Sequence, residues 1–321
     1  MKRDISVDIV KFIAVFLIIN SHADIMYPHL SVLATGGAIG DCLFLFVSGF
    51  TLFLGEMKPF PSFYKRRINR IFPSVIASVL FIHLITLSPN IPVVEFLGGG
   101  FIEAIMIYYI LLWLIRKFVP SKTEWIVFAV LVFSFVVYLL FFPYKYETGY
   151  KGMYGITTPF RWIPYFGFML MGACVGLKRE LICYSLKKDI FVFFVCLFLF
   201  YGIQLSAKHY SLMAPFQIFT LIPLMGIVYY LYKICHCRLF ADLYKTKVGN
   251  KMIMLVSGLC LESYLIQFNL ITDKLNSIWP LNLLLISVFI IACSYIVRCM
   301  ARFFMQTFQK DDYNWQKIIE I

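Results

Sequence analysis

The chain alternates between long apolar stretches and short polar ones, and each apolar stretch has about the length needed to cross a bilayer. A membrane-spanning helix needs about 20 mostly apolar residues. About ten stretches meet this requirement: residues 5–23, 37–55, 71–88, 101–115, 124–142, 160–177, 190–206, 214–232, 252–271 and 280–299. The pattern predicts an all-α fold, a polytopic membrane helix bundle of about ten transmembrane helices.

The composition excludes an ordinary soluble protein. Hydrophobic residues make up 61% of the 321 residues and charged residues 14%, against about 45–50% and 25% in globular proteins. A soluble fold of this length could not keep that much apolar surface away from water. The sequence contains no internal repeat, low-complexity segment or long linker. We therefore expect a single membrane-embedded domain, residues 1–321, with no appended soluble domain.

The distribution of positive charge predicts the orientation of the chain in the membrane. Most of the 29 Lys and Arg residues lie in alternate loops, beginning with Lys2 and Arg3. Cytoplasmic loops are enriched in Lys and Arg, so both termini are expected in the cytoplasm of a multi-pass protein of the plasma (inner) membrane. The basic loops would then contact membrane lipids. In a soluble chain a net charge of +12 would suggest binding to nucleic acid. This sequence has no nucleic-acid-binding motif, so we do not expect nucleic acid as a partner.

The nine cysteines do not indicate a disulfide framework or a metal site. Most of them lie inside apolar stretches, where thiols behave as small hydrophobic groups. The one cluster, Cys235-His236-Cys237, lacks the usual spacing of zinc ligands. We expect no bound metal.

Charged residues inside the first apolar stretch mark it as unusual. Such charges cost about 2.5–3.5 kcal/mol each on insertion scales and usually face a polar partner or cavity. Lys11 and His22 are eleven residues apart, which places them on one face of a helix, about 16 Å apart along its axis. Asp8 is one turn from Lys11 and can pair with it. The alternative is a Lys11 that extends to the interface and a hydrogen-bonded interfacial His22.

Two further features follow in the next segments. The second stretch contains Ser48-Gly49, which is most simply a close helix–helix contact. A basic cluster then occurs at the edge of the third stretch, with Arg66, Arg67 and Arg70. These cations can be a topology signal alone. Arg67 and Arg70 are one helical turn apart, however, and arginine is well suited to bidentate phosphate contacts.

These motifs together resemble the acyltransferase 3 family, multi-pass membrane proteins that O-acetylate cell-surface glycans and related acceptors. The resemblance rests on Lys11 and His22 in the first span and on the aromatic run from Phe44 that ends at Ser48-Gly49-Phe50. It continues with Arg67 and Arg70 before Phe72-Pro73, then with the segments 160–172 and 257–267. The family more often has Arg where Lys11 stands and often has His where Gln267 stands.

The resemblance implies acyl transfer from acetyl-CoA in the cytosol to a hydroxyl of a cell-surface glycan or lipid-linked sugar. It implies that the donor is held by Arg66, Arg67, Arg70 and Ser48. His22 would be the catalytic base or be acylated itself, with Lys11 or a backbone donor beside Ser48 stabilising the oxyanion. Asp24 and Asp41 are candidates to orient the imidazole. The candidates to line the acceptor cavity are Asp41, Arg161, Trp162, Glu262 and Gln267. Glu262 could instead form a buried ion pair or be protonated, and Trp162 could belong to an aromatic belt at the membrane interface.

Two other classes of protein remain open at this stage. A transporter of a small polar solute would also carry charges in its spans, but typically with broken helices in two matching halves. A membrane scaffold could use the same helices without chemistry. Labelled acetyl-CoA distinguishes the three, because only an enzyme transfers the label to an acceptor.

Overall fold

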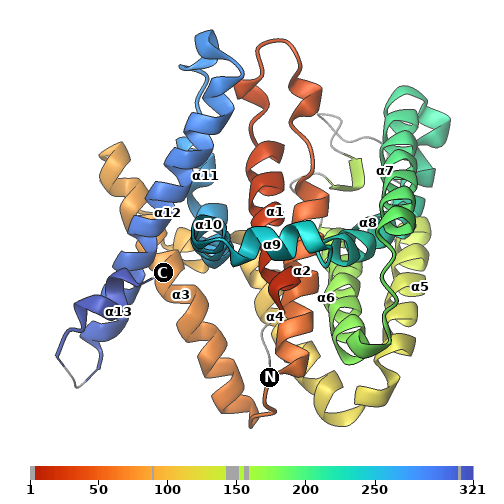
Figure 1. Ribbon diagram of the computed structural model, residues 1–321, viewed down its shortest axis with the longest axis horizontal. Coiled ribbons are helices and arrows are strands. Elements are labelled where there is room, and N and C mark those ends of the chain that lie inside the picture. The colour runs from red at the N-terminus through yellow and green to blue at the C-terminus, as the bar shows by residue number, and fades with distance from the viewer. Residues whose placement is uncertain (1–3, 89, 142–151, 155–158, 310–311, 321) are drawn as a thin grey trace. The chain divides into compact units, whose positions relative to one another are not determined.

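The computed structural model describes residues 4–320 apart from 89, 142–151, 155–158 and 310–311, and every element in this part is helical (Figure 1). The α-helices are α1 (Ile5–Ser21), α2 (Gly37–Leu54), α3 (Phe60–Thr86), α4 (Gly99–Phe118), α5 (Thr123–Phe141), α6 (Trp162–Leu177), α7 (Leu186–His209), α8 (Leu221–Ile234), α9 (Arg238–Lys245), α10 (Lys247–Gly258), α11 (Cys260–Leu270), α12 (Leu281–Thr307) and α13 (Trp315–Ile319). The 3-10 helices are η1 (Asp24–Met26), η2 (Ser31–Leu33), η3 (Val93–Leu97), η4 (Pro120–Lys122), η5 (Gly152–Tyr154), η6 (Pro159–Arg161), η7 (Arg179–Leu181), η8 (Ser211–Thr220) and η9 (Asn276–Ile278).

The helices confirm the predicted all-α class of a membrane protein. Among the described residues, 7 helical segments are long and apolar enough to cross a bilayer, and an eighth is added if the bent pair α10 and α11 is one span. Helices α1, with 17 residues, and α6, with 16, are shorter. The number of ten spans and the side of the termini stay predictions. Five cations that entered the charge asymmetry lie outside the described residues: Lys2, Arg3, Lys145, Lys151 and Lys310.

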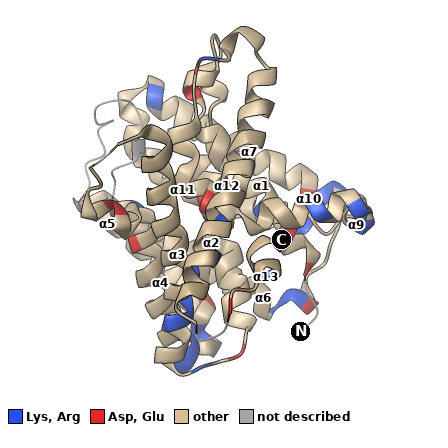
Figure 2. Cartoon of the chain, turned by 90° about the vertical axis from the view of Figure 1, so that its left-hand side faces the viewer, with Lys and Arg blue, Asp and Glu red and all other residues tan. Residues whose placement is uncertain are grey.

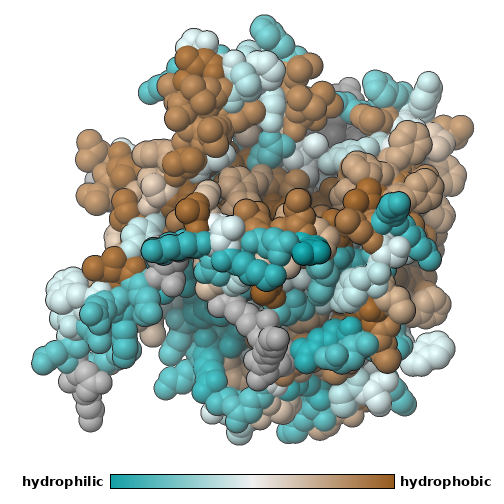
Figure 3. Space-filling model, in the orientation of Figure 1, coloured by the Kyte–Doolittle hydropathy of each residue, from teal (hydrophilic) through white to brown (hydrophobic). Residues whose placement is uncertain are grey.

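Exposed apolar side chains along the helices are consistent with contact to lipid. On α12, Leu284 is 60% exposed and Val288 59%, whereas Ile290 and Val297 are buried. Figure 3 shows hydrophobic residues along the N-terminal part of α12 and hydrophilic ones around its C-terminal part and α13. Lys and Arg also gather on α9 and the adjoining start of α10 (Figure 2). Such a division between apolar and basic segments is typical of a membrane protein.

The chain divides into two compact units that are interleaved along the sequence. The first unit consists of Met1–Val10, Asp41–Glu56 and Leu112–Tyr244, and the second of Lys11–Gly40, Met57–Leu111 and Lys245–Ile321. In the first unit α5 packs against α6, and α7 packs against α8 and η8. In the second unit α3, α11 and α12 pack against one another, and α13 packs against α12.

A backbone-to-backbone contact between α2 and α6 is central to the first unit. A Cβ atom on Gly49 would lie 1.7 Å from the carbonyl oxygen of Met169, and one on Gly172 would lie 1.9 Å from that of Phe46. Both distances are far below van der Waals contact, so each helix presents a glycine where the other helix crosses. The structure thus assigns Gly49 of the Ser48-Gly49 pair to close helix packing, the simpler of the two interpretations.

Gly49→Ala and Gly172→Ala should both destabilise the first unit, because the new methyl group can be placed only if α2 and α6 move apart. Overpacking of this kind costs about 1–3 kcal/mol or more. The measurement is the yield of monodisperse protein and its thermal unfolding in detergent. Gly202→Ala on α7 is the matched control, since its Cβ would meet no atom within 4 Å. Gly202→Ala should leave the free energy of unfolding unchanged or raise it by about 0.5–1 kcal/mol. Equal behaviour of all three variants would contradict the packing assignment.

Candidate active site

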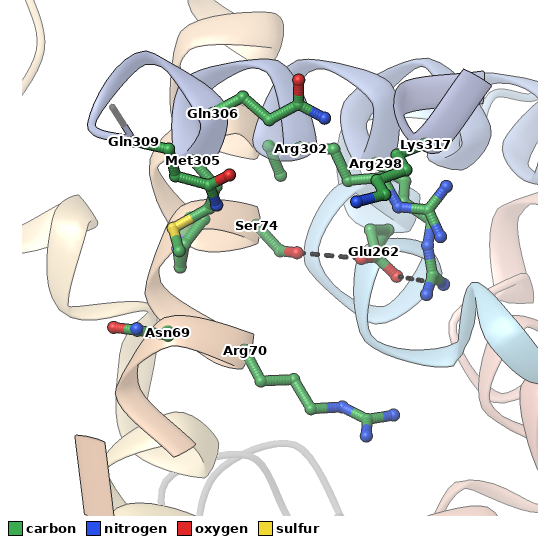
Figure 4. Close-up of a pocket in the computed structure, with 12 residues that line it drawn as sticks. Asn69, Arg70, Ser74, Glu262, Arg298, Arg302, Met305, Gln306, Gln309 and Lys317 are labelled. Carbon is green, nitrogen blue, oxygen red and sulfur yellow. Dashed lines mark hydrogen bonds and ion pairs between the residues drawn. The ribbon is translucent and has the colours of Figure 1, made fainter. Parts of the chain in front are cut away.

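A cationic pocket of about 240 Å³ lies in the second unit, between α3, α11, α12 and α13 (Figure 4). Four cations and one carboxylate line it: Arg70, Arg298, Arg302, Lys317 and Glu262. The remaining lining residues are Asn69, Pro73, Ser74, Ala301, Met305, Gln306 and Gln309. The excess of positive charge suits an anionic ligand, and the cations are of the types that bind phosphate.

The wall formed by α3 follows from the local sequence. Pro59 precedes the helix, and Pro73 lies inside it. A proline has no amide hydrogen, so the carbonyl of Asn69, four residues earlier, cannot form its usual helical hydrogen bond. Arg70 and Ser74 are four residues apart and therefore lie on one face of α3, and both line the pocket.

The opposite wall depends on a break in the chain between α10 and α11. The two helices meet at an angle of 73°. A break leaves carbonyl groups at the end of the first helix without helical partners. Arg298 Nη1 on α12 donates a hydrogen bond to one of them, the carbonyl of Gly258. Arg298 therefore stabilises the break, and its guanidinium also forms part of the pocket.

Glu262, in the first turn of α11, joins the two walls. Its Oε1 accepts a hydrogen bond from Ser74 Oγ at 2.8 Å, and its Oε2 lies 3.9 Å from Arg298 Nη1 (Figure 4). The residue is only 5% exposed. A buried carboxylate needs a charge partner and hydrogen bonds. Arg298 is the charge partner and Ser74 donates one hydrogen bond, while Oε2 accepts no hydrogen bond from the described residues. The structure places Glu262, which was a candidate for the acceptor cavity, in the cationic pocket.

The predicted donor-binding residues separate in the structure. Arg70 lines the pocket, whereas Arg66, Arg67 and Ser48 are not among its lining residues. The Arg67 guanidinium lies over the rings of Phe63 and Tyr109, with centroids at 5.6 and 6.0 Å. Such cation–π contacts stabilise a cation in place. The two arginines that were expected to hold one phosphate together therefore face different surroundings, although they are one turn apart.

His22 follows directly after the last residue of α1. Its ring centroid lies 4.0 Å from that of Phe268 on α11, and the planes of the two rings are inclined by 45°. Lys11 lies within α1, about 16 Å from His22 along the helix axis at 1.5 Å per residue. This distance excludes direct contact between the two in a straight helix. Asp24, the candidate to orient the imidazole, lies in η1 with an exposed side chain.

Amide side chains hold the loop that follows His22. Asn20 Nδ2 donates to the carbonyls of Leu33, at 2.7 Å, and Thr35, at 3.0 Å. Asn282 Nδ2, at the start of α12, donates to the carbonyl of Met26 at 2.9 Å. These bonds fasten the loop that follows His22 to α1 and α12.

Helix α11 connects the cationic pocket to His22. Glu262 in the pocket and Phe268 against the imidazole are six residues apart, about 9 Å along the helix. Gln267 lies between them in sequence, is 0% exposed, and neither of its amide atoms has a hydrogen-bond partner among the described residues. An unpaired buried amide costs about 1–3 kcal/mol per group, which makes Gln267 a candidate to bind a substrate.

The remaining candidates lie in the first unit. Asp41, on α2, interacts electrostatically with Arg161, and Arg161 Nη1 donates to the carbonyl of Tyr154 at 3.3 Å. Trp162, the next residue, begins α6. Tyr165 Oη and Gln217 Nε2 are buried and have no hydrogen-bond partner among the described residues. The structure thus brings together Asp41, Arg161 and Tyr165, because the Arg161 guanidinium lies 5.8 Å from the centroid of the Tyr165 ring. Tyr165 was not among the residues predicted from the sequence.

Three pocket residues were missed as well. Arg298, Arg302 and Lys317 counted only as cytoplasmic topology signals in the sequence. A signal was present, because Arg298 and Arg302 are four residues apart at the end of an apolar stretch and therefore share a helical face. No sequence pattern could place that face opposite Arg70, since the contact joins distant parts of the chain.

The apolar helices, together with a match to a known family, identify a membrane acyltransferase. A family model described as an acyltransferase domain matches residues 4–299, nearly the whole chain. The chain belongs to the acyltransferase 3 family, as the motifs indicated. No curated protein and no solved structure gave a significant match.

Ser74→Ala should lower the stability of the second unit, because it leaves the buried Glu262 without its hydrogen bond. The expected loss is about 1–3 kcal/mol, measured by thermal unfolding in detergent. Ser78→Ala is the control on the same helix. Ser78 is also buried, but the one hydrogen bond that its hydroxyl donates to the described residues goes to the carbonyl of Val75 within the helix. Its loss should change stability by less than about 0.5 kcal/mol. A Ser74 variant as stable as the Ser78 variant would refute the structural role of the Ser74–Glu262 bond.

Proposed function

We propose that this membrane acyltransferase transfers an acetyl or similar short acyl group from acyl-CoA to a hydroxyl of a cell-surface glycan or lipid-linked sugar. The observation that carries the proposal is the arrangement along α11, which has a cationic pocket at one end and a histidine near the other. Acyl-CoA has a phosphate-rich end and a reactive thioester joined by a flexible arm. The two ends of α11 match this division of the donor.

The phosphates would bind in the cationic pocket. Arg70, Arg298 and Arg302 offer guanidinium groups, which form paired, charge-assisted hydrogen bonds with phosphate. The distribution of cations among the loops predicts that the N-terminal part of α3, which carries Arg70, lies on the cytoplasmic side. Acyl-CoA is found on this side. The acyl-bearing arm would then run along α11, past Gln267 and toward His22.

His22 would act as the general base. A neutral imidazole nitrogen accepts the proton of the acceptor hydroxyl while the hydroxyl oxygen attacks the thioester carbonyl carbon. The tetrahedral intermediate then collapses: the C–S bond breaks, the ester forms, and the thiolate of CoA takes the proton back from the imidazolium. In the alternative route the imidazole attacks first and carries the acyl group to the hydroxyl.

Other residues would support this step. The oxyanion needs a donor or a positive charge, and the side-chain amide of Gln267 is now a candidate beside Lys11. Asp41, Arg161 and Trp162 remain candidates to bind the acceptor, and Asp24 remains a candidate to orient the imidazole. The polar groups of Asp41 and Arg161 suit sugar hydroxyls, and the indole of Trp162 suits the apolar face of a sugar ring.

Arg70→Ala should weaken binding of acyl-CoA. Loss of one charge-assisted hydrogen bond costs about 1.5–3 kcal/mol, equivalent to a Kd about 10–150 times higher. Isothermal titration of CoA into the purified full-length protein measures the effect. Lys65→Ala is the control, because Lys65 is an exposed cation of the same helix that does not line the pocket. An Arg70 variant with the affinity of the control would remove Arg70 from the donor site.

His22→Ala and His22→Gln should abolish measurable transfer while CoA binding persists. General-base assistance contributes about 10²–10⁴-fold, and glutamine keeps a hydrogen bond but cannot take the proton. The assay follows the labelled acyl group of acetyl-CoA into glycan in membranes that contain the protein. His209→Gln, at the exposed end of α7, serves as the control for the loss of a histidine. Near-normal transfer by either His22 variant would show that His22 is structural. Label that crosses the membrane without transfer would indicate a carrier instead.

A further inference from the structure

One wall of the cationic pocket lies outside the residues that the family model matches. Residues 312–320 turn back along the C-terminal part of α12, and α13 packs against that helix. Lys317 of this segment and Arg302 of α12 both line the pocket (Figure 4). The family match ends at residue 299. The family match therefore covers neither of these two cations.

Several hydrogen bonds fasten the segment to α12. Tyr295 Oη donates to the carbonyl of Ile319 at 2.5 Å. Arg302 Nη1 donates to the carbonyl of Ile318 at 3.2 Å and to that of Glu320. Ile318 is only 4% exposed. The segment is thus docked by backbone contacts and by a buried side chain.

The position of Lys317 within the segment is also defined. Its backbone amide donates to Oδ1 of Asn314, which caps α13, at 3.0 Å. Asn314 in turn exchanges two hydrogen bonds with Gln306 of α12, at 2.8 and 3.2 Å. The rings of Phe303 and Tyr313 stack with centroids 4.9 Å apart and planes inclined by 7°. These contacts hold the backbone of Lys317 at the edge of the pocket.

Arg302 is held in a way that leaves it able to bind a ligand. Both of its hydrogen bonds to the described residues start from Nη1. A guanidinium has five N–H donors, so donors on Nη2 and Nε can serve an anion. The segment therefore contributes one cation itself and positions a second.

A purely structural role does not explain the charges. Four cations around one small cavity repel one another, and Glu262 offsets only part of that repulsion. A segment that served only to cover α12 would gain nothing by adding Lys317 to this group. Because the side chain of Lys317 is exposed, water screens its repulsion by the other cations, whereas an anion bound among the four cations would be attracted by all of them.

We propose that residues 312–320 form part of the donor site, in which Lys317 and the Arg302 that this segment positions bind phosphate groups of acyl-CoA. The assignment of acyl-CoA as the ligand rests on the proposed function. The phosphate of an anionic lipid shares the same chemistry, so the experiment separates the two sources.

The test measures the Kd of CoA for the full-length protein in nanodiscs of phosphatidylcholine alone. Lys317→Gln should raise the Kd about ten-fold, and Lys317→Glu, which reverses the charge, should raise it further. Lys317→Arg keeps the charge and should stay within about three-fold of the native value. Lys247→Glu is the control, since Lys247 is an exposed lysine of the same unit that does not line the pocket. The thermal unfolding of all Lys317 variants should match that of the native protein, because the side chain is exposed.

Three results would overturn the proposal. In the first, the native protein does not bind CoA. In the second, Lys317→Glu leaves the Kd of CoA unchanged but releases phosphatidylglycerol added to the nanodiscs, which identifies a lipid site. In the third, Lys317→Glu changes the binding of neither CoA nor phosphatidylglycerol, which would show that the segment only packs against α12. A native protein that binds CoA through Lys317 but transfers no acyl group would support this proposal and refute the proposed function, so the two can fail separately.

Discussion

The break between α10 and α11 is the constraint on which the candidate active site depends. In a bilayer an unpaired carbonyl finds no water, so a broken helix persists only where protein groups satisfy its free ends. Arg298 does this by donating to the carbonyl of Gly258. Because the chain turns by 73° at this point, α11 begins at the cationic pocket and leads to Phe268 and His22. In a straight helix through the same residues, α11 would run in another direction and Glu262 would not meet Ser74 as it does here.

The buried charge of Glu262 restricts this arrangement further. Removing one partner from a buried ion pair is costly, since the other charge then lacks compensation. Glu262 is linked to α3 through Ser74 and to α12 through Arg298. The same side chains that stabilise the broken helix therefore line the site where an anion would bind. Stability and binding share residues here, so substitutions at Arg298 or Glu262 would alter both.

Most helices of the fold were predictable from sequence, although the predicted span 252–271 is divided into α10 and α11. The site was predictable only in part. Apolar stretches of bilayer length marked the helices, because lipid imposes a local requirement on every span. Helical spacing predicted that His22 shares a face with Lys11, and the structure places His22 directly after the end of α1. The different surroundings of Arg67 and Arg70 did not, since they depend on Tyr109 of α4 and on α12. Lys317 was unpredictable for the same reason, as its place depends on a segment that turns back on an earlier helix.

The hydrogen bond between Ser74 and Glu262 also has a consequence for the biosynthesis of the protein. The two residues are separated by 188 positions, and translation adds about 5–20 residues per second. About 10–40 s therefore pass between the synthesis of the two walls of the pocket. During that time α3 already lies in the membrane with Arg70 and Ser74 but without α11 and α12. The nascent chain has no complete pocket, and the site arises only after the last helices have been inserted.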